Sequence, residues 1–318
     1  MRIEYHRTLI ADRVRNTALF AALKQVISRG ETVVADIGAG TGLIGLMAAR
    51  LGARDVYLYE MAEVADVAAE IVKKNRARNC HVMPCSSLDM VEPPRVDVVI
   101  SETLGNYAFE ENMIQTLADA RARHLKRGGT IIPARVRQFV APVVSDRFDK
   151  ELHAWGRVGD ELGIALDLSV AEDMSLNNIY VRNVKPGDLL ANGGSAVVWD
   201  EVDFNAAQAS SPNRKGEAAW PIASDVVIHG LGVWWEAELV PGVTLSTAPD
   251  APLTHWEQLY FPLLSPVACR RGDTLKVMLL SRSSEEAGTH LAWKVSRLDA
   301  DGKAQERQAL DLDKGFLP

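Results

Sequence analysis

Hydrophobic and polar residues follow two different patterns along the chain, and the first pattern covers residues 32–133. Short apolar runs that end at polar residues or glycine indicate strands, and longer segments with apolar residues three or four apart indicate helices. Strands are predicted at 33–36, 55–59, 81–83, 96–100 and 130–133, and helices at 43–51, 63–77 and 111–125. This alternation predicts an α/β fold with a parallel sheet covered by helices on both faces.

The second pattern begins after about residue 137 and predicts mostly strands. Its β-rich runs are joined by Gly, Pro, Asn and Asp turns and lie at 138–144, 226–239, 275–280 and 291–298. Between them, residues 148–175 have a helical pattern. We therefore predict a first domain over residues 1–137 and a second over 138–318, the latter a β-barrel or sandwich with a helical insertion.

Charge and composition narrow the functional classes. The formal net charge of -7 leaves no basic field for nucleic acid, and it is compatible with a cationic substrate. Cys80, Cys85 and Cys269 are too few and too scattered for a disulfide framework or a zinc site. No apolar stretch reaches the ~18 residues of a membrane span, and the amino terminus contains no apolar signal core. We expect a protein of the reducing cytoplasm that contacts neither nucleic acid nor membrane.

A glycine-rich turn, Asp36-Ile37-Gly38-Ala39-Gly40-Thr41-Gly42, joins the first strand to the first helix. Glycines let the backbone approach a ligand, and the helix amino terminus adds free N–H groups. Asp36 suits a cationic or hydroxyl-rich ligand better than a pyrophosphate, which favours S-adenosylmethionine (SAM). Glu60 ends the second strand, where it can accept hydrogen bonds from ribose hydroxyls. A dinucleotide and a merely structural turn remain the alternatives.

Two carboxylates flank the turn that follows the fourth strand. Glu102 lies at the carboxyl end of that strand, where open α/β sheets bind their ligands. Gly105 permits a sharp turn, so Glu111 can return to face Glu102. Two converging carboxylates form a fork for a planar cation with several N–H donors, such as guanidinium. Alternatively, Glu110 and Glu111 only favour the helix amino terminus and Glu102 is solvated.

Taken in order, these motifs resemble the protein arginine methyltransferase family. The resemblance rests on the glycine turn, on Glu60 and on the hairpin with Glu102 and Glu111. Four further motifs also match: His6-x-x-Leu9-x-x-Asp12-x-x-Arg15, Ile71-Val72-Lys73-Lys74-Asn75, Leu245-Ser246-Thr247-Ala248-Pro249 and Thr254-His255-Trp256. The likeness extends from about residue 6 to residue 280. Any one element is weak, but the set in this order is highly specific.

The resemblance implies a class I SAM-dependent (Rossmann-like) methyltransferase domain, then a β-barrel with a helical arm, about 148–175, that forms a head-to-tail homodimer. Glu102 and Glu111 would clamp the guanidinium of the substrate. Asp12 and His255 would form a pair beside them. The implied cofactor contacts are Arg15 at the carboxylate of SAM, Glu60 at its ribose, Gly38, Gly40 and Gly42 along its backbone face, Met113 near the sulfonium, and Asp36 and Ser87.

Departures from the family pattern concern the substrate slot. Thr103 replaces a usual tryptophan, Asn106 a usual tyrosine, and Leu9 a common methionine, and the chain starts too late to contain the aromatic Tyr-Phe-x-x-Tyr lid helix. We expect methylation of arginine in a protein or peptide, with free arginine or a small guanidino metabolite as the alternative. A scaffold without catalysis, or methyl transfer to nucleic acid or an amine, would be a different class of function.

Overall fold

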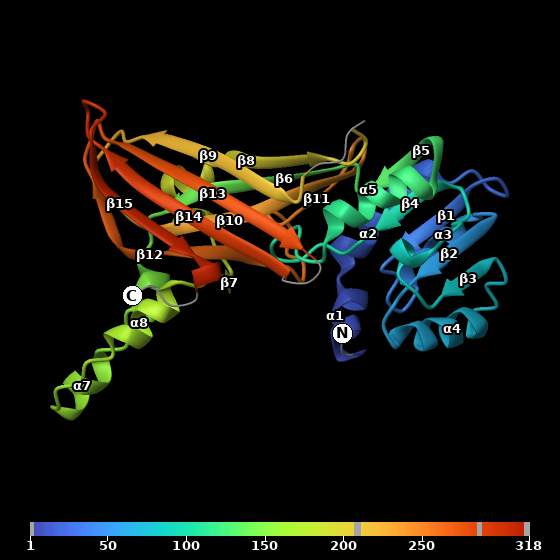
Figure 1. Ribbon diagram of the computed structural model, residues 1–318, viewed down its shortest axis with the longest axis horizontal. Helices are drawn as coiled ribbons and strands as arrows, with labels where there is room; N and C mark the ends of the chain where they lie inside the picture. Colours follow the sequence, from blue (N-terminus) through green and yellow to red (C-terminus); the bar gives the residue numbers. More distant parts are fainter. Residues whose placement is uncertain (1–2, 207–210, 285–287, 315–318) are drawn as a thin grey trace.

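The computed structural model describes residues 3–206, 211–284 and 288–314. Its amino-terminal half contains a five-stranded parallel sheet in the order β3-β2-β1-β4-β5 (Figure 1). The strands are β1 Val33–Ile37, β2 Asp55–Tyr59, β3 Cys80–Met83, β4 Val96–Ser101 and β5 Leu125–Ile132. The predicted parallel sheet is confirmed. Its central strand β1 is buried along its whole length, as expected for a sheet covered on both faces.

The helices of this half are α1 Ile3–Ala11, α2 Arg13–Val26, α3 Leu43–Leu51, α4 Val64–Lys74 and α5 Met113–Arg123. Helix α3 spans the predicted residues and ends at Gly52, whose φ of 101° is a left-handed value that favours glycine. The sequence analysis did not predict α1 and α2. Helix α2 is capped by Asp12, whose side chain accepts a hydrogen bond from the Arg15 backbone N–H at 2.9 Å.

The second half is built from two antiparallel sheets. One has the order β7-β12-β10-β6-β8, with β11 added to β10, and the other has the order β15-β14-β13-β9. Strand β8 lies beside β9 and β12 beside β15, which closes the two sheets into a barrel. The strands are β6 Arg135–Val143, β7 Tyr180–Arg182, β8 Val197–Asp203, β9 Asn213–Pro221, β10 Val226–Val240, β11 Val243–Ser246, β12 Gln258–Cys269, β13 Thr274–Ser284, β14 Gly288–Leu298 and β15 Ala304–Asp311.

The four predicted β-rich runs correspond to β6, β10, β13 and β14. The predicted division after residue 137 falls near the start of β6, which already belongs to the barrel. Strands β7, β8, β9, β11, β12 and β15 were not predicted. On β8, β9 and β15, charged residues interrupt the apolar pattern that would indicate a strand. Single-turn 3₁₀ helices complete the chain at Ser87–Asp89, Pro186–Asp188, Leu190–Gly193 and Leu312–Lys314.

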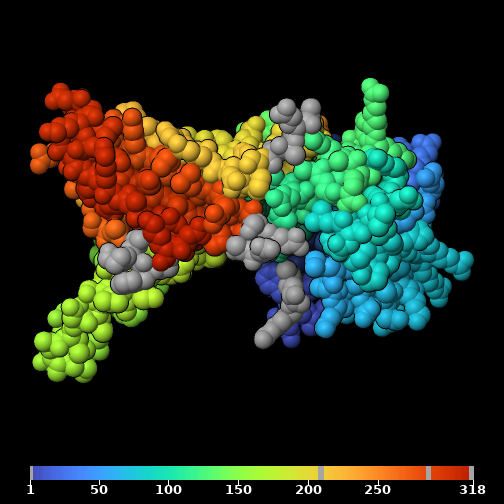
Figure 2. Space-filling view, viewed as in Figure 1, coloured from blue at the N-terminus to red at the C-terminus, as the bar shows by residue number. Residues whose placement is uncertain are grey.

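A helical arm leaves the barrel between β6 and β7, as the pattern at 148–175 predicted. It consists of α6 Arg147–Leu152, α7 Arg157–Leu162 and α8 Ser169–Leu176. Helix α6 packs against the barrel through Phe148, and the arm then projects away from the rest of the molecule, with α7 at its end (Figures 1 and 2). Exposed apolar side chains line it: Trp155, Val158, Leu162, Ile164, Leu166, Val170 and Met174. In the described part of the chain, no helix has the length and apolarity needed to cross a bilayer.

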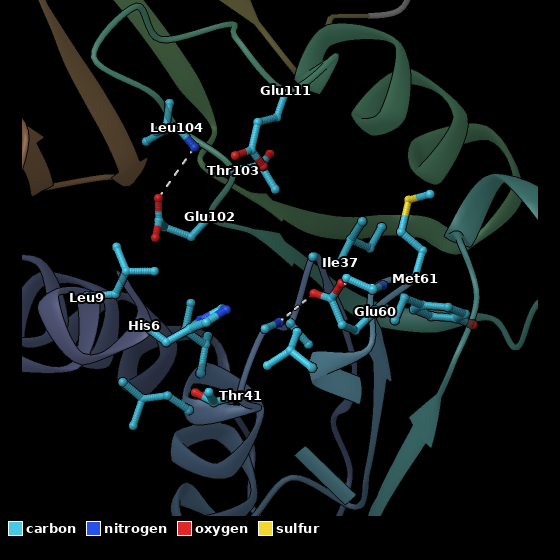
Figure 3. A pocket seen from close by; sticks show the side chains of 18 of the residues that line it. His6, Leu9, Ile37, Thr41, Glu60, Met61, Glu102, Thr103, Leu104 and Glu111 are labelled. Carbon is cyan, nitrogen blue, oxygen red and sulfur yellow. Dashed lines mark hydrogen bonds between the residues drawn. The ribbon is translucent and has the colours of Figure 1, made fainter. Parts of the chain in front are cut away.

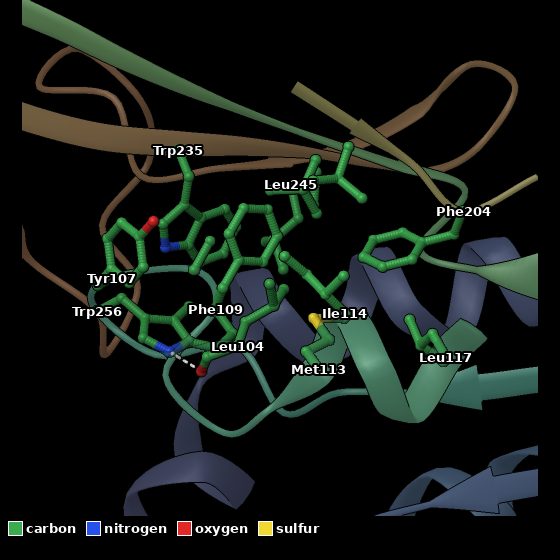
Figure 4. Close-up of a cluster of buried hydrophobic side chains, with 14 of the residues drawn as sticks. Leu104, Tyr107, Phe109, Met113, Ile114, Leu117, Phe204, Trp235, Leu245 and Trp256 are labelled. Carbon is green, nitrogen blue, oxygen red and sulfur yellow. Dashed lines mark hydrogen bonds between the residues drawn. The ribbon is translucent and has the colours of Figure 1, made fainter. Parts of the chain in front are cut away.

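The loop between β4 and α5 is packed against the barrel by a buried apolar cluster (Figure 4). Tyr107 and Phe109 of the loop are fully buried, as is Trp235 of β10. Burying side chains of this size stabilises a contact by roughly 1.5–3 kcal/mol each. The loop that carries Glu102 and Glu111 is therefore held by both halves of the molecule.

Candidate active site

A cavity of about 440 Å³ lies at the carboxyl ends of β1, β2 and β4, with α1 forming another wall (Figure 3). Ligands of open parallel sheets bind at this edge. Most predicted site residues line the cavity: Arg15, Gly38, Gly40, Glu60, Ser87, Glu102, Glu111 and His255. Asp12 lies directly behind His255. Asp36, Gly42 and Met113 do not line it.

The glycine turn and Glu60 form one side of the cavity. Gly38 has a φ of 73°, and a Cβ atom there would lie 2.6 Å from Cγ2 of Thr103, so a side chain does not fit. Glu60 accepts hydrogen bonds from the backbone N–H of Gly40 at 2.8 Å and of Ala62 at 2.9 Å. These bonds fix the Glu60 carboxylate at the cavity wall, with acceptor capacity left for a ligand.

Asp36 has a different position from the one expected. Its side chain is fully buried under the turn, and one carboxylate oxygen accepts a hydrogen bond from the Gly45 N–H at 2.8 Å. Burial raises the pKa of this carboxyl group to about 7. The prediction that Asp36 faces the ligand is therefore corrected: its side chain supports the turn and the start of α3 from behind.

Met113 and Gly42 also lie away from the cavity wall. Met113 begins α5 and is fully buried, and Figure 4 places it beside Ile114 in the apolar cluster. Its thioether thus packs under the loop, and the expected contact with the sulfonium is not part of this arrangement. At Gly42, a Cβ atom would lie 3.0 Å from Leu58, so this glycine allows α3 to pack closely on the sheet.

Glu102 and Glu111 enter the same cavity from the two ends of the loop, with Thr103 between them (Figure 3). Glu102 accepts a hydrogen bond from Arg15 Nε at 2.5 Å, and both side chains are nearly buried. Burial raises the pKa of Glu102 to about 7, against the opposing effect of Arg15, and Glu111 adds to the rise. Burial, then Glu110 and Glu60, raise the pKa of Glu111. The cavity thus holds more carboxyl groups than cationic side chains to neutralise them.

Asp12 and His255 form the expected pair across 243 residues of sequence. His255 Nδ1 lies 2.7 Å from the Asp12 carboxylate, which also accepts a hydrogen bond from the His255 backbone N–H. Burial lowers the pKa of His255 even though Asp12 opposes the change. Hydrogen bonds from Arg15 N–H and His255 outweigh burial and lower the pKa of Asp12. The pair is thus an imidazole oriented by a buried carboxylate at the cavity wall.

Four further residues that were not predicted as site residues shape the site. Tyr5 and His6 of α1 line the cavity, as does Glu110. Trp235 donates a hydrogen bond from Nε1 to the Gly105 carbonyl at 2.9 Å, which anchors the loop. His6 belongs to the amino-terminal motif His6-x-x-Leu9-x-x-Asp12-x-x-Arg15, which could have pointed to it, and Tyr5 directly precedes that motif. No sequence signal pairs Trp235 with a loop 130 residues earlier.

The residues present fit a nucleoside cofactor with a cationic sulfur and a carboxylate. His6 Nε2 and Ser87 Oγ are buried polar atoms at the cavity wall without a hydrogen-bond partner in the structure. Such atoms are rare in folded proteins unless a ligand or water satisfies them. Glu60 offers acceptors for hydroxyl groups, and Arg15 supplies a cation for a carboxylate.

This fold, with a glycine turn and an acidic end of β2 beside paired glutamates, defines the class of SAM-dependent methyltransferases. Comparison with known proteins gives the family. Residues 134–296 match the model of the arginine methyltransferase oligomerization subdomain, and residues 16–152 match that of ribosomal protein L11 methyltransferase. The chain is 32% identical over 266 residues to protein arginine N-methyltransferase 6 of Xenopus tropicalis, covering 80% of this chain and 77% of that protein.

Other relatives agree. Protein arginine N-methyltransferase 10 of Arabidopsis thaliana is 30% identical over 313 residues, covering 88% of this chain and 81% of that protein. A solved structure of the Arabidopsis thaliana protein arginine methyltransferase 10 superposes with a TM-score of 0.80 at 24% identity, covering 98% of each chain. The chain belongs to the protein arginine N-methyltransferase family, and SAM is its cofactor.

Proposed function

We propose that this enzyme methylates arginine side chains within proteins or peptides, and that Glu102 and Glu111 clamp the guanidinium. The observation that carries the proposal is that both carboxyl groups line one cavity together with Gly38, Gly40 and Glu60. A protein acceptor is favoured over free arginine because the relatives are named for arginine in proteins. No feature of the cavity favours the smaller acceptor.

The cofactor would lie between α1 and the glycine turn. Bound SAM supplies an activated methyl group. In this proposal Arg15 holds its carboxylate, Glu60 its ribose hydroxyls, and Gly38 and Gly40 its backbone-facing side. Ser87 also lines the cavity, and its unpartnered hydroxyl can bind the base. These roles agree with the polar atoms that each residue presents to the cavity.

The protein must position a cation as a nucleophile. The guanidinium of arginine has a pKa of ~12.5–13.8, so complete deprotonation at neutral pH would cost about 8 kcal/mol. The clamp avoids this cost because the two carboxylates draw positive charge away from the attacking nitrogen while the cation is held. Alignment of the reacting atoms contributes roughly 7–11 kcal/mol. The proton leaves during or after transfer, and His255, oriented by Asp12, can accept it.

The clamp is tested by Glu111→Gln, which keeps the shape of the side chain and removes its charge. We expect turnover with an arginine-rich peptide to fall by at least about 100-fold, because a preorganised charge is lost from the transition state. SAM affinity, measured by calorimetry, should stay within about threefold, because Glu111 contacts the substrate and not the cofactor. The control is Glu70→Gln on the exposed face of α4. Near-normal turnover of Glu111→Gln would contradict the proposal.

Assembly and location extend the proposal. The exposed apolar side chains of α7 and α8 suit burial against a second copy, so we infer a homodimer formed through the arm. The three cysteines are free thiols, which agrees with the reducing cytoplasm. We propose that residues 1–137 form the cofactor domain and residues 138–318 the barrel that presents the substrate, with the first residues of β6, from Arg135, at the junction.

A further inference from the structure

Tyr5 stands at the opening of the cavity on the side of the carboxylates. It projects from α1, lines the same cavity as Glu102 and Glu111, and is 44% exposed. Its ring packs edge-on against His255, with 6.3 Å between ring centroids and an interplanar angle of 77°. The Tyr5 ring is therefore held at the entrance, next to the proposed proton acceptor, while one part of it remains open to an incoming side chain.

The charges near Tyr5 also place it on the substrate side. Burial raises the pKa of its phenol, and Glu102, Glu111 and Glu110 raise it further. Tyr5 therefore remains a neutral phenol beside these carboxyl groups at any physiological pH. The other tyrosine at the cavity wall, Tyr59, ends β2 beside Glu60 and thus lies on the cofactor side.

A bound guanidinium has two kinds of surface. Its edge carries the N–H donors, which a carboxylate fork satisfies, and its two faces are weakly hydrated planes that favour aromatic rings. Glu102 and Glu111 would contact only the edge of the guanidinium. A site that fixes the plane of the guanidinium, as methyl transfer to one nitrogen requires, needs a surface against a face as well.

We propose that the Tyr5 ring packs on the face of the substrate guanidinium that Glu102 and Glu111 hold, which makes Tyr5 a substrate-binding residue of the arginine slot. This inference rests on the proposed function. It identifies the acceptor as a flat cation that enters past α1, with its face on Tyr5 and its edge on the glutamates. A compact ammonium group, such as that of lysine, offers no face for this contact.

The test compares Tyr5→Phe, Tyr5→Leu and Tyr5→Ala in the full-length enzyme. Tyr5→Phe keeps the ring and should retain the KM for an arginine-rich peptide within about twofold, whereas Tyr5→Leu and Tyr5→Ala should raise it roughly tenfold. The KM for SAM should remain within about twofold in all three variants. Ile3→Ala is the matched control, because Ile3 is exposed at 52% on the same helix and does not line the cavity.

Direct binding separates the possible failures. Calorimetry with the peptide and S-adenosylhomocysteine should show weaker peptide binding for Tyr5→Ala than for wild type and Ile3→Ala. Equal peptide affinity in Tyr5→Ala and Ile3→Ala would overturn the role of Tyr5 alone. A loss confined to the affinity for SAM would also overturn it, because Tyr5 would then cover the cofactor. Absence of peptide binding and methylation in wild type would overturn the proposed function itself.

Discussion

The Arg15 guanidinium is bound to the Glu102 carboxylate, with Nε and Oε2 2.5 Å apart and both side chains nearly buried. A second nitrogen of Arg15 donates to Asn16 at 2.7 Å. Arg15 therefore joins the proposed cofactor subsite to the proposed substrate clamp, because its guanidinium can contact both the carboxylate of SAM and that of Glu102. The pair also keeps Glu102 from being an isolated buried charge.

Breaking this pair should weaken the fold and the site together. Arg15→Ala leaves Glu102 buried without its cation, so we expect a loss of about 3–5 kcal/mol of stability and weaker SAM binding. Denaturant titration and calorimetry measure the two effects. In a Glu102→Gln background the same substitution should cost much less stability. Equal costs in both backgrounds would contradict the coupling, and Arg13→Ala, exposed on the same helix, is the control.

The activity should depend on pH through Glu102. Burial raises its pKa to about 7, so the neutral acid persists at mildly acidic pH and the charged form that binds a cation dominates only above that value. We expect kcat/KM for an arginine-rich peptide to rise between about pH 5.5 and 8 and then to level off. A pH–rate profile at saturating SAM measures this. A flat profile over that range would argue against an ionised Glu102 as part of the clamp.

Asp12 has two functions, since it caps α2 and orients His255. Asparagine caps a helix about as well as aspartate, so Asp12→Asn should preserve the bond to the Arg15 N–H. Its amide NH2 would then face the His255 backbone N–H, so we expect a loss of about 1–3 kcal/mol of stability. The charge that orients His255 is lost, and turnover should fall by roughly 100-fold. Asp12→Ala should lose more stability than Asp12→Asn, because it removes the helix cap as well. Thermal denaturation and initial rates distinguish the two roles, and undiminished turnover of Asp12→Asn would exclude the pair from catalysis.

Trp235 should act on catalysis through the loop that it holds. Trp235→Phe removes the donor to the Gly105 carbonyl, so stability should fall by about 1–3 kcal/mol. Turnover should fall with it, because Glu102 and Glu111 lose their fixed spacing, while SAM affinity is retained. Trp220→Phe is a matched control: its indole also donates to a carbonyl, that of Ser195, elsewhere in the barrel. Equal turnover in the two variants would show that the loop needs no such anchor.

The arm should determine the oligomeric state. Leu162 is 64% exposed near the end of α7. Leu162→Asp places a charge where we infer an apolar interface, so the dimer measured by light scattering should dissociate into monomers. Val91→Asp is the control, because Val91 is 91% exposed on the cofactor domain. A dimer that survives Leu162→Asp unchanged would place the interface elsewhere.

The sequence by itself determined the parallel sheet, helix α3 and the helical arm. These elements depend on patterns within about 5–15 neighbouring residues, such as the apolar run of β1 and the stop at Gly52, which act before distant contacts form. It also placed Glu102 and Glu60 at strand ends, and parallel strands bring such ends to one edge.

Only the tertiary structure decided which of those residues face the cavity. Asp36 is the last but one residue of β1 and Glu60 directly follows β2, yet the Asp36 side chain lies under the glycine turn and Glu60 lies on the cavity wall. Met113 turned into the apolar cluster because burial of its side chain against the barrel is favourable. Trp235 reached a loop 130 residues away. Contacts across such separations arise from the packing of two domains, and no local pattern of residues encodes them.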